Sequence, residues 1–266
     1  MLRLTACARA SKPGTNSARG KRRPALGDTD NIMRLKAILV AAGLILGGCA
    51  TPPDPAGVND PYEATNRAIF DFNLKVDRLA LKPTAEIYQD YVPEGGRDAL
   101  RAALDNLHAP VVLANDLLQG EGSRAVDTSG RFLINSTLGL GGLFDVAARL
   151  GIESHDEDFG QTLAVWGAGE GPYVMLPLLG PSNPRDAAGK AVDIALDPTE
   201  YIKIKRHWVW DGTRQYLNIV DTRARNLETL DGIERNSLDF YATVRSLYRQ
   251  NRGFQIRNGL PAPGDE

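Results

Sequence analysis

Apolar side chains recur at helical spacing over much of the chain, and this pattern restricts the fold more than any other feature. Leu100, Leu104, Leu107 and Val111 fall on one face of a helix, because an α-helix repeats every 3.6 residues. Two further stripes lie nearer the C-terminus: Leu217, Val220, Leu227 and Leu230, and then Leu238, Tyr241, Val244 and Tyr248. No run of useful length alternates as a strand would, and no internal repeat occurs. We therefore expect a mostly α-helical fold.

Prolines and capping residues set the expected helix ends. Asp60-Pro61 should open the first helix, because proline suits the first helical position. Pro110 should kink or restart the helix that carries the first stripe. Asn183-Pro184 should start another helix, and the last two stripes predict two helices, over about 210–230 and 233–251.

A short apolar run, Ala37 to Leu46, leads into Gly47-Gly48-Cys49. It follows a positively charged start and is typical of a secretory signal. It is too short to cross a bilayer as a mature helix, which needs roughly 20 residues. The segment from Leu46 to Cys49 resembles a bacterial lipobox, which implies that Cys49 becomes the lipid-modified first residue of the mature protein. The alternative is an ordinary signal peptide with an unrelated cysteine.

The chain divides by composition into four parts. Residues 1–48 are leader and signal peptide, and residues 1–32 are either an overlong leader or lie upstream of a true start at Met33. Residues 49–60 form a Pro-rich tether, residues 61–252 the helical domain, and residues 253–266 a polar tail. Only Cys7 and Cys49 are cysteines, so no disulfide framework is available.

Loss of the signal peptide makes the chain acidic. It removes nine of the 31 basic residues and two of the 33 acidic ones, which leaves a formal net charge of about −9. Such a chain should not bind nucleic acid or anionic head groups through bulk electrostatics. Its contact with a membrane must therefore be apolar.

Sites for catalysis, metals and cofactors are not indicated. The chain lacks the G-x-S-x-G spacing of a serine hydrolase, and His108, His155 and His207 lie in three separate settings. The acidic stretch "HDEDFG" departs from a calcium loop, because Gln161 occupies the place of its glycine. The glycine-rich stretches "GLGGLF" and "GAGEGP" lack the residues of a nucleotide fingerprint. They suit either close core packing or an apolar turn that dips into acyl chains. We therefore expect no enzyme activity, no metal and no cofactor.

Several long stretches together resemble the MlaA/VacJ family of outer-membrane lipoproteins. The matching stretches, in the family's order over about residues 59–200 and more loosely to about 250, are "NDPYEATNRAIFDFN", "YVPEGGRDALRAALDNL", "LLQGE", "RFLINSTLGLGGLFDVA" and "DFGQTLAVWGAGEGPYVMLPLLGPSNPRD". The resemblance implies a ring-like or curved assembly of amphipathic helices, seated in one leaflet of the outer membrane and facing the periplasm, with a central polar channel. It further implies removal of misplaced phospholipid from the outer leaflet, transfer to a soluble periplasmic carrier, and association with a trimeric porin.

The residues suggest where such a protein would meet the membrane. We expect the apolar stretches around "AIFDFNL" and "TLGLGGLFD" to supply the bilayer-facing belt and the channel rim, with the following candidates: Phe70, Phe72, Asn73, Leu74, Leu138, Gly139, Leu140, Gly141, Gly142, Leu143 and Phe144. The channel wall, or a contact with the porin, is expected at Gly167, Gly169, Gly171, Pro172 and Tyr173. The rival hypothesis is a static envelope scaffold that binds porins without moving lipid.

Overall fold

The computed structural model describes residues 59–202 and 207–261, so the predicted leader, Cys49 and most of the tether lie outside the described residues. The described chain is mostly helical, as predicted. Its helical elements are α2 (Glu63–Val76), the π-helical turn η1 (Asp77–Leu81), α3 (Lys82–Tyr91), α4 (Glu94–Gln119), α5 (Gly122–Thr137), α6 (Val146–Arg149), α7 (Phe159–Val165), α8 (Pro184–Leu196), the 3₁₀ turn η2 (Pro198–Tyr201), α9 (His207–Arg225), α10 (Leu227–Asn236) and α11 (Phe240–Ile256). Within these ranges, no helix combines the length and the apolarity needed to cross a membrane.

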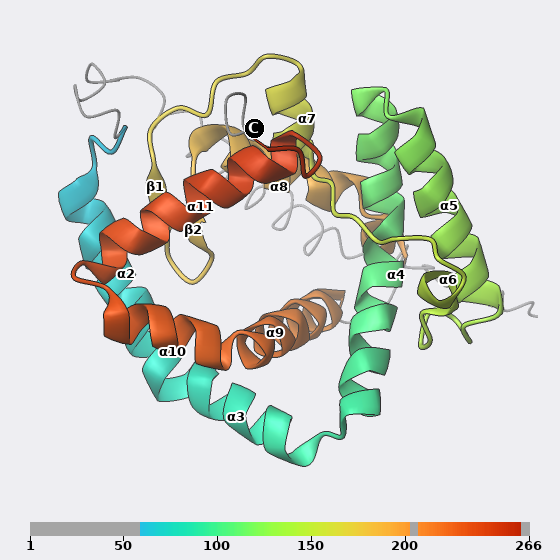
Figure 1. Cartoon of the computed structure of the whole chain (residues 1–266), viewed down its shortest axis with the longest axis horizontal. Coiled ribbons are helices and arrows are strands. Elements are labelled where there is room, and N and C mark those ends of the chain that lie inside the picture. Colours follow the sequence, from blue (N-terminus) through green and yellow to red (C-terminus); the bar gives the residue numbers. More distant parts are fainter. Residues whose placement is uncertain (1–58, 203–206, 262–266) are drawn as a thin grey trace, which may run out of the picture.

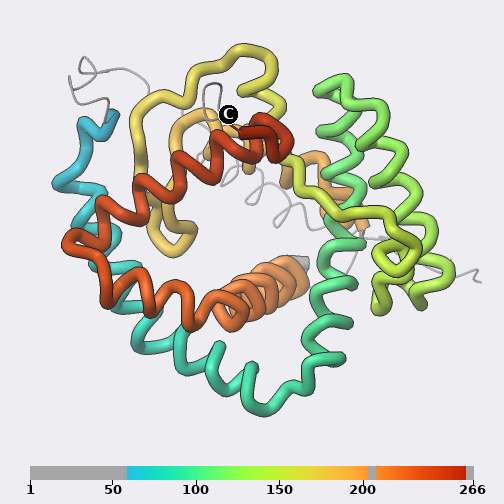
Figure 2. The backbone as a smooth tube through the Cα atoms, viewed as in Figure 1, coloured from blue at the N-terminus to red at the C-terminus, as the bar shows by residue number. Residues whose placement is uncertain are grey.

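The helices follow one another around a ring (Figure 1). The segment from α2 through α3 forms one arc, α4 continues it, and α11 runs back toward α2. The backbone trace in Figure 2 follows the same circuit, with α9 directed toward the middle. Contacts of α3 with α9 and with α10, and of α7 with α11, join segments distant in sequence. The predicted ring-like arrangement is therefore confirmed, while the polar channel and the membrane seat stay predictions.

Two small apolar clusters take the place of one continuous core. Phe70 of α2, Tyr173, Met175 and Tyr241 form the first, in which Phe70 meets Tyr241 edge to face at 5.6 Å. The second is formed by Ala85, Ala224 and Leu227, where α3, α9 and α10 meet. A ring has a thin wall, and a thin wall leaves room only for local clusters of this kind.

Ion pairs join the ring where these clusters end. Arg67 of α2 pairs with Asp239 at the start of α11 (2.6 Å), and Arg245 of α11 pairs with Asp60 (2.6 Å). Arg252 of α11 bonds to Asp158 before α7 (2.6 Å) and to Asp186 of α8 (2.8 Å).

Several predicted boundaries needed correction. Helix α4 continues through Pro110 and does not restart there, since one missing N–H does not outweigh the packing on both sides. The C-terminal region forms three helices rather than two, because the chain breaks after Arg225 and again at Ser237. Leu238 therefore lies in a turn and is fully exposed, not on a buried stripe. Helix α11 runs to Ile256, so it extends into the predicted polar tail, which begins at Gly253.

One element was not predicted. Strands β1 (Val174–Leu176) and β2 (Gly180–Ser182) pair antiparallel as a hairpin. Strands of three residues are too short to show an alternating pattern in the sequence, and this pair contains Pro181.

Candidate functional site

The described part of the molecule is polar inside and apolar outside to an unusual degree. Twelve apolar residues are buried there, but 28 large apolar side chains are exposed. Seventeen polar or charged residues are buried, among them Asp116, Asp221, Arg223 and Arg252. Scattered exposed apolar residues are normal, but extensive apolar surface marks contact with a membrane or another protein.

The segment between α5 and α6 concentrates this apolar surface. Leu138, Leu140, Leu143 and Phe144 are each between 46% and 68% exposed. The segment nevertheless pairs most of its own N–H groups: those of residues 138, 139, 141, 142 and 144 donate to carbonyls of residues 134–139. Unpaired peptide groups are very unfavourable in hydrocarbon, so a turn with this bonding is suited to immersion in acyl chains. We name residues 138–144 the apolar loop.

Glycines give the apolar loop its shape. The φ angles of Gly141 (73°) and Gly142 (96°) lie in the left-handed region, and so does that of Leu140 (53°). A Cβ on Gly142 would lie 2.6 Å from the Cβ of Asn106, and one on Gly139 would lie 2.2 Å from the carbonyl oxygen of Phe144. Gly139 and Gly142 are buried, so their role is close packing rather than contact with lipid.

A second apolar projection is the tip of the β1–β2 hairpin. Leu178 and Leu179 are 62% and 55% exposed there. Two asparagines of α2 hold the hairpin. Asn66 donates to the Tyr173 carbonyl (3.0 Å) and accepts from the Met175 N–H (2.9 Å), and Asn73 bonds in the same way to Leu176 and Leu178. Side-chain amides of a helix thus pair with the outer edge of β1.

The candidates around "AIFDFNL" fall into different environments. Phe72 is 49% exposed, as a belt residue should be. Phe70 is only 8% exposed in the first apolar cluster, which corrects its assignment to the belt. Leu74 packs partly buried against the same cluster, and Asn73 fastens the hairpin.

The candidates in "GAGEGPY" also divide. Gly167, Gly169 and Gly171 lie exposed in the loop between α7 and β1, and Pro172 is half-buried. Tyr173 is 3% exposed in the first apolar cluster, so it is a core residue and not part of a channel wall. For Phe70, the apolar pattern of the sequence could not distinguish a helix face toward the membrane from a helix face toward the core, because both faces are apolar.

A pocket of about 220 Å³ with a mixed polar and apolar lining lies between α4, α8 and α9, and we name it the inner pocket. The residues that line it are Leu104, His108, Val111, Asp193, Ile194, Asp197, Arg214, Gln215 and Asn218. Burial opposes ionisation of Asp197, but hydrogen bonds from Arg214 and Thr199 hold the pKa of its carboxyl below the ordinary value. Burial raises the pKa of Asp193, which accepts from Asn115 and from the N–H of Phe159. None of these polar residues except His108 was singled out from the sequence, since their partners lie on separate helices.

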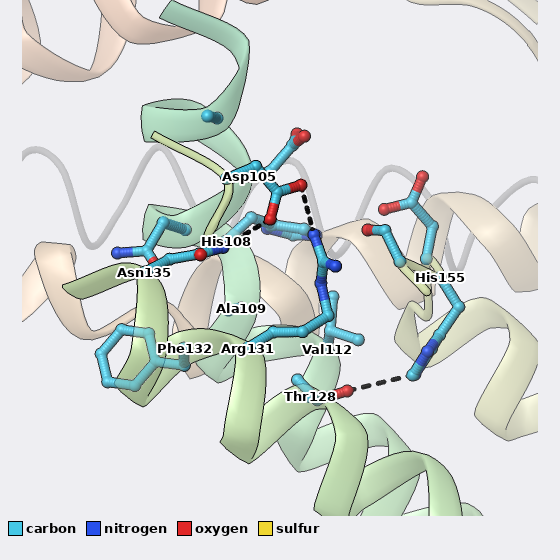
Figure 3. Close-up of a pocket in the computed structure, with 14 residues that line it drawn as sticks. Asp105, His108, Ala109, Val112, Thr128, Arg131, Phe132, Asn135 and His155 are labelled. Atoms are coloured by element: carbon cyan, nitrogen blue, oxygen red, sulfur yellow. Dashed lines mark hydrogen bonds and ion pairs between the residues drawn. The ribbon is translucent and has the colours of Figure 1, made fainter. Parts of the chain in front are cut away.

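A second pocket, the α4–α5 pocket, lies between those two helices and the loop at 152–156 (Figure 3). In Figure 3, Arg131 extends into it from α5, and His155 reaches toward Thr128 from the loop. Arg131 donates to Asp145 (2.7 Å) and to the Ile152 carbonyl. His108 lines both pockets.

A Thr-His-Asp group beside this pocket does not form a nucleophile. The Thr128 hydroxyl donates to Asp116 (2.7 Å), and His155 Nε2 lies 3.1 Å from both partners. An activated nucleophile must be within reach of substrate and have its proton directed to a base. Thr128 is only 4% exposed and its proton is held by a fully buried Asp116, so the group fastens the loop to α4 and α5.

Comparison with known proteins places this geometry in a family. A family model described as MlaA lipoprotein matches residues 58–255. The chain belongs to the MlaA lipoprotein family. The family resemblance read from the sequence is therefore confirmed.

Named relatives agree with this assignment. Proteins called "Intermembrane phospholipid transport system lipoprotein MlaA" from Shigella flexneri and from Escherichia coli K12 are each 34% identical over 231 residues, covering 85% of this chain and 90% of theirs. The protein of that name from Haemophilus influenzae is 35% identical over 239 residues and is covered to 93%. A solved structure titled "Structural basis for maintenance of bacterial outer membrane lipid asymmetry" aligns with a TM-score of 0.67 at 36% identity, over 74% of this chain and 98% of that one.

Proposed function

We propose that this chain is an outer-membrane lipoprotein of intermembrane phospholipid transport, which removes phospholipid misplaced in the outer leaflet and passes it toward the periplasm. The observation that carries the proposal is the inverted distribution of side chains around a ring: apolar residues are exposed, and polar residues are buried within the wall and line the inner pocket. Family membership and the names of the relatives supply the substrate class.

Physical chemistry explains why this arrangement suits the task. A phospholipid head group crosses hydrocarbon at a large cost, because its charges lose their hydration without gaining partners. A polar path inside an apolar belt lowers that cost while the tails stay in lipid. Helices suit the ring because they satisfy their own backbone groups.

The proposed anchor is Cys49, with the apolar loop and the exposed residue Phe72 as the belt. Each buried CH₂ contributes about 0.8 kcal/mol, so two or more acyl chains anchor a protein stably. A Cys49→Ala chain should therefore move from the membrane fraction to the soluble periplasmic fraction. Membrane fractionation like that of the wild type would refute lipidation.

The remaining parts of the proposal concern direction and partners. The sequence has no nucleotide-binding fingerprint, so we take the polar channel as passive, with net direction supplied by partner proteins. The exposed glycine loop that contains Gly167, Gly169 and Gly171 is our candidate contact for a trimeric porin. A soluble periplasmic carrier would receive the lipid.

The decisive experiment measures phospholipid on the outer face of cells that have or lack this protein. Transport predicts more surface phospholipid in its absence, restored by the wild-type chain. A static scaffold predicts no change in surface phospholipid as long as porin levels are held constant, and that result would overturn the proposal.

A further inference from the structure

Three side chains converge on one buried carboxylate where α3, α4 and α9 meet. Asp221 of α9 is 1% exposed. It accepts hydrogen bonds from the Tyr88 hydroxyl of α3 (3.1 Å), from Nε of Arg101 of α4 (3.3 Å) and from Nε of Arg225 one turn further along α9 (3.0 Å). In Figure 1, α9 lies inside the angle between α3 and α4, and it contacts both helices. The cluster is therefore on the inner side of the ring.

A third arginine lies beside this cluster without a partner. Arg97 is one turn before Arg101 on the same face of α4, and side chains at that spacing have their Cβ atoms about 5–6 Å apart. In the described part of the chain, its side chain makes no hydrogen bond or ion pair. Of its three nitrogens only Nε is buried without a partner, so the two terminal nitrogens stay accessible.

The charge of Arg97 acts on the same hydroxyl that bonds to the buried carboxylate. Burial and the charge of Asp221 raise the pKa of Tyr88 to about 12, and the charge of Arg97 opposes this rise. The hydroxyl therefore stays protonated and donates to Asp221, and Arg97 lies near it. We name Tyr88, Arg97, Arg101, Asp221 and Arg225 the arginine corner.

The arginine corner carries more positive than negative charge. Asp221 pairs with both Arg101 and Arg225. A second carboxylate, Asp98, pairs with Arg101 (3.2 Å) and is 59% exposed. Asp105, the next carboxylate along α4, lines the α4–α5 pocket and forms no ion pair with these arginines among the described residues. With Arg97 included, three guanidinium groups face two paired carboxylates, which leaves one formal positive charge.

The arginines of the corner can be reached by a bound molecule. The side chains of Arg101 and Arg225 are 33% and 45% exposed, although Asp221 occupies their Nε atoms. A guanidinium presents its N–H donors in a planar fork that matches the oxygens of a phosphate, and it binds phosphate in a bidentate manner. A phosphodiester carries one negative charge, which equals the surplus of the corner. The donors and the charge therefore fit one phosphodiester.

The arginine corner adjoins the inner pocket. Leu104 of α4 lines that pocket, and Arg101 lies about one turn before it. Asn218 of α9 lines the pocket too, and Asp221 follows about one turn later. On both helices the corner is thus within one helical turn, about 5.4 Å, of the pocket. A molecule bound at the corner can extend into the inner pocket.

We propose that the arginine corner binds the phosphodiester of a phospholipid, with Arg97 as the cation that this phosphate neutralises. The rest of the head group then lies toward the inner pocket. The proposal rests on the proposed function in phospholipid transport. It gives the corner a role in lipid recognition, because a neutral lipid with the same acyl chains has no group to bind there.

A lipid-retention experiment tests the proposal. The lipidated full chain is incubated in detergent with equal amounts of phosphatidylethanolamine and of diacylglycerol with the same acyl chains, repurified, and its bound lipid measured by mass spectrometry. We expect the wild type to retain the phospholipid preferentially. Arg97→Gln should lower that preference about three- to fivefold, as expected for a partly exposed ion pair. Arg97→Lys keeps the charge without the planar fork, and should lower it only about twofold.

The double variant Arg97→Gln/Arg225→Gln should lower the preference at least about tenfold, and glutamine at 225 still offers Asp221 a donor. Phosphatidylglycerol in place of phosphatidylethanolamine should give the same losses, because the two lipids share the phosphodiester. Arg235→Gln is the matched control, since it removes an exposed arginine of α10 outside the corner and should leave the preference unchanged.

An unchanged preference in Arg97→Gln and in the double variant would overturn the proposal, and so would an equal loss in Arg235→Gln. A loss confined to phosphatidylglycerol would show that the corner responds to the net charge of the lipid. Inorganic phosphate that competes at the concentration of the lipid would make the corner a site for free phosphate. Either result contradicts a phosphodiester site. Retention of neither lipid by the wild type contradicts the proposed function itself, whereas retention without preference over diacylglycerol contradicts only the corner.

Discussion

Gly142 shows how one residue couples the apolar loop to the helical wall. Its φ of 96° lies in the left-handed region, which glycine adopts without steric cost, and it packs on the side chain of Asn106. Gly141 has a similar φ of 73° but faces open space. An alanine at Gly141 would therefore introduce backbone strain alone, whereas an alanine at Gly142 would add a steric clash with Asn106.

We predict that Gly142→Ala lowers the free energy of unfolding by about 2–4 kcal/mol, because left-handed strain adds to the overlap with Asn106. Gly141→Ala should cost only about 1 kcal/mol, the strain alone. Urea unfolding of both variants in detergent measures the difference. Equal losses would show that Asn106 moves aside freely.

Individual residues also show which contacts can be predicted from the sequence and which cannot. Asn183 was expected to start a helix, and its side chain accepts from the Asp186 N–H as a cap should. Gly120 closes α4 in a left-handed conformation, which is the usual place of a glycine directly after a helix. Asn66 gave no such signal, because its partner Tyr173 is 107 positions away. Local rules identify caps, but the partners of buried polar residues depend on the tertiary fold.

At the scale of elements, the apolar loop is the projection best suited to enter lipid. Its exposed leucines stand on a turn whose peptide groups are mostly bonded internally. Composition alone leaves core packing and membrane contact equally open for this stretch. The structure divides the two roles within it: the glycines at 139 and 142 are buried, and the leucines and Phe144 are exposed.

We predict that Leu140→Asp weakens binding of the chain to phospholipid vesicles at least about tenfold, because a charge replaces an apolar side chain at the bilayer. The measurement is vesicle co-sedimentation in the Cys49→Ala background, so that acyl chains do not mask the effect. Gln89→Asp introduces the same charge on the exposed face of α3 and should change binding little. Equal binding by Leu140→Asp and Gln89→Asp would remove the loop from the belt.

For the molecule as a whole, closure of the ring depends on contacts between its two ends. Asp60 is buried, and it accepts from Arg245 (2.6 Å) and from the Tyr241 hydroxyl (2.5 Å). Arg67 and Asp239 form a parallel pair that is about 40% exposed on each side. The ring itself was expected only through the family resemblance, because helical periodicity gives the faces of helices and not the circuit they follow.

We predict that Arg245→Met lowers the free energy of unfolding by about 3 kcal/mol, because it leaves the buried Asp60 carboxylate without its cation. Arg67→Met should cost about 1 kcal/mol or less, as for an exposed ion pair. Urea denaturation followed by circular dichroism compares the two. If the two variants are equally stable, Asp60 gains water when Arg245 is lost and the closure is looser than described.

Acid should loosen the ring at the joint of α7, α8 and α11. Burial opposes ionisation of Asp158 and Asp186, but hydrogen bonds from Arg252 outweigh it and lower the pKa of both carboxyls. A carboxyl with a lowered pKa stabilises the fold fully above its ordinary value near 3.8 and loses that contribution as the pH falls below it. The stability advantage of the wild type over Asp186→Asn should therefore shrink between pH 5 and pH 2.

Asp193 supplies a control, because its contribution to stability should change with pH in the opposite direction. Burial raises its pKa, so its ionised form destabilises the fold and the wild type should gain relative to Asp193→Asn as the pH falls toward 4. Urea unfolding of the three proteins across this range measures both trends. If the stabilities of Asp186→Asn and Asp193→Asn change with pH in parallel, the ion pairs of Arg252 do not set the acid sensitivity of the ring. The general accumulation of positive charge would then open the ring instead.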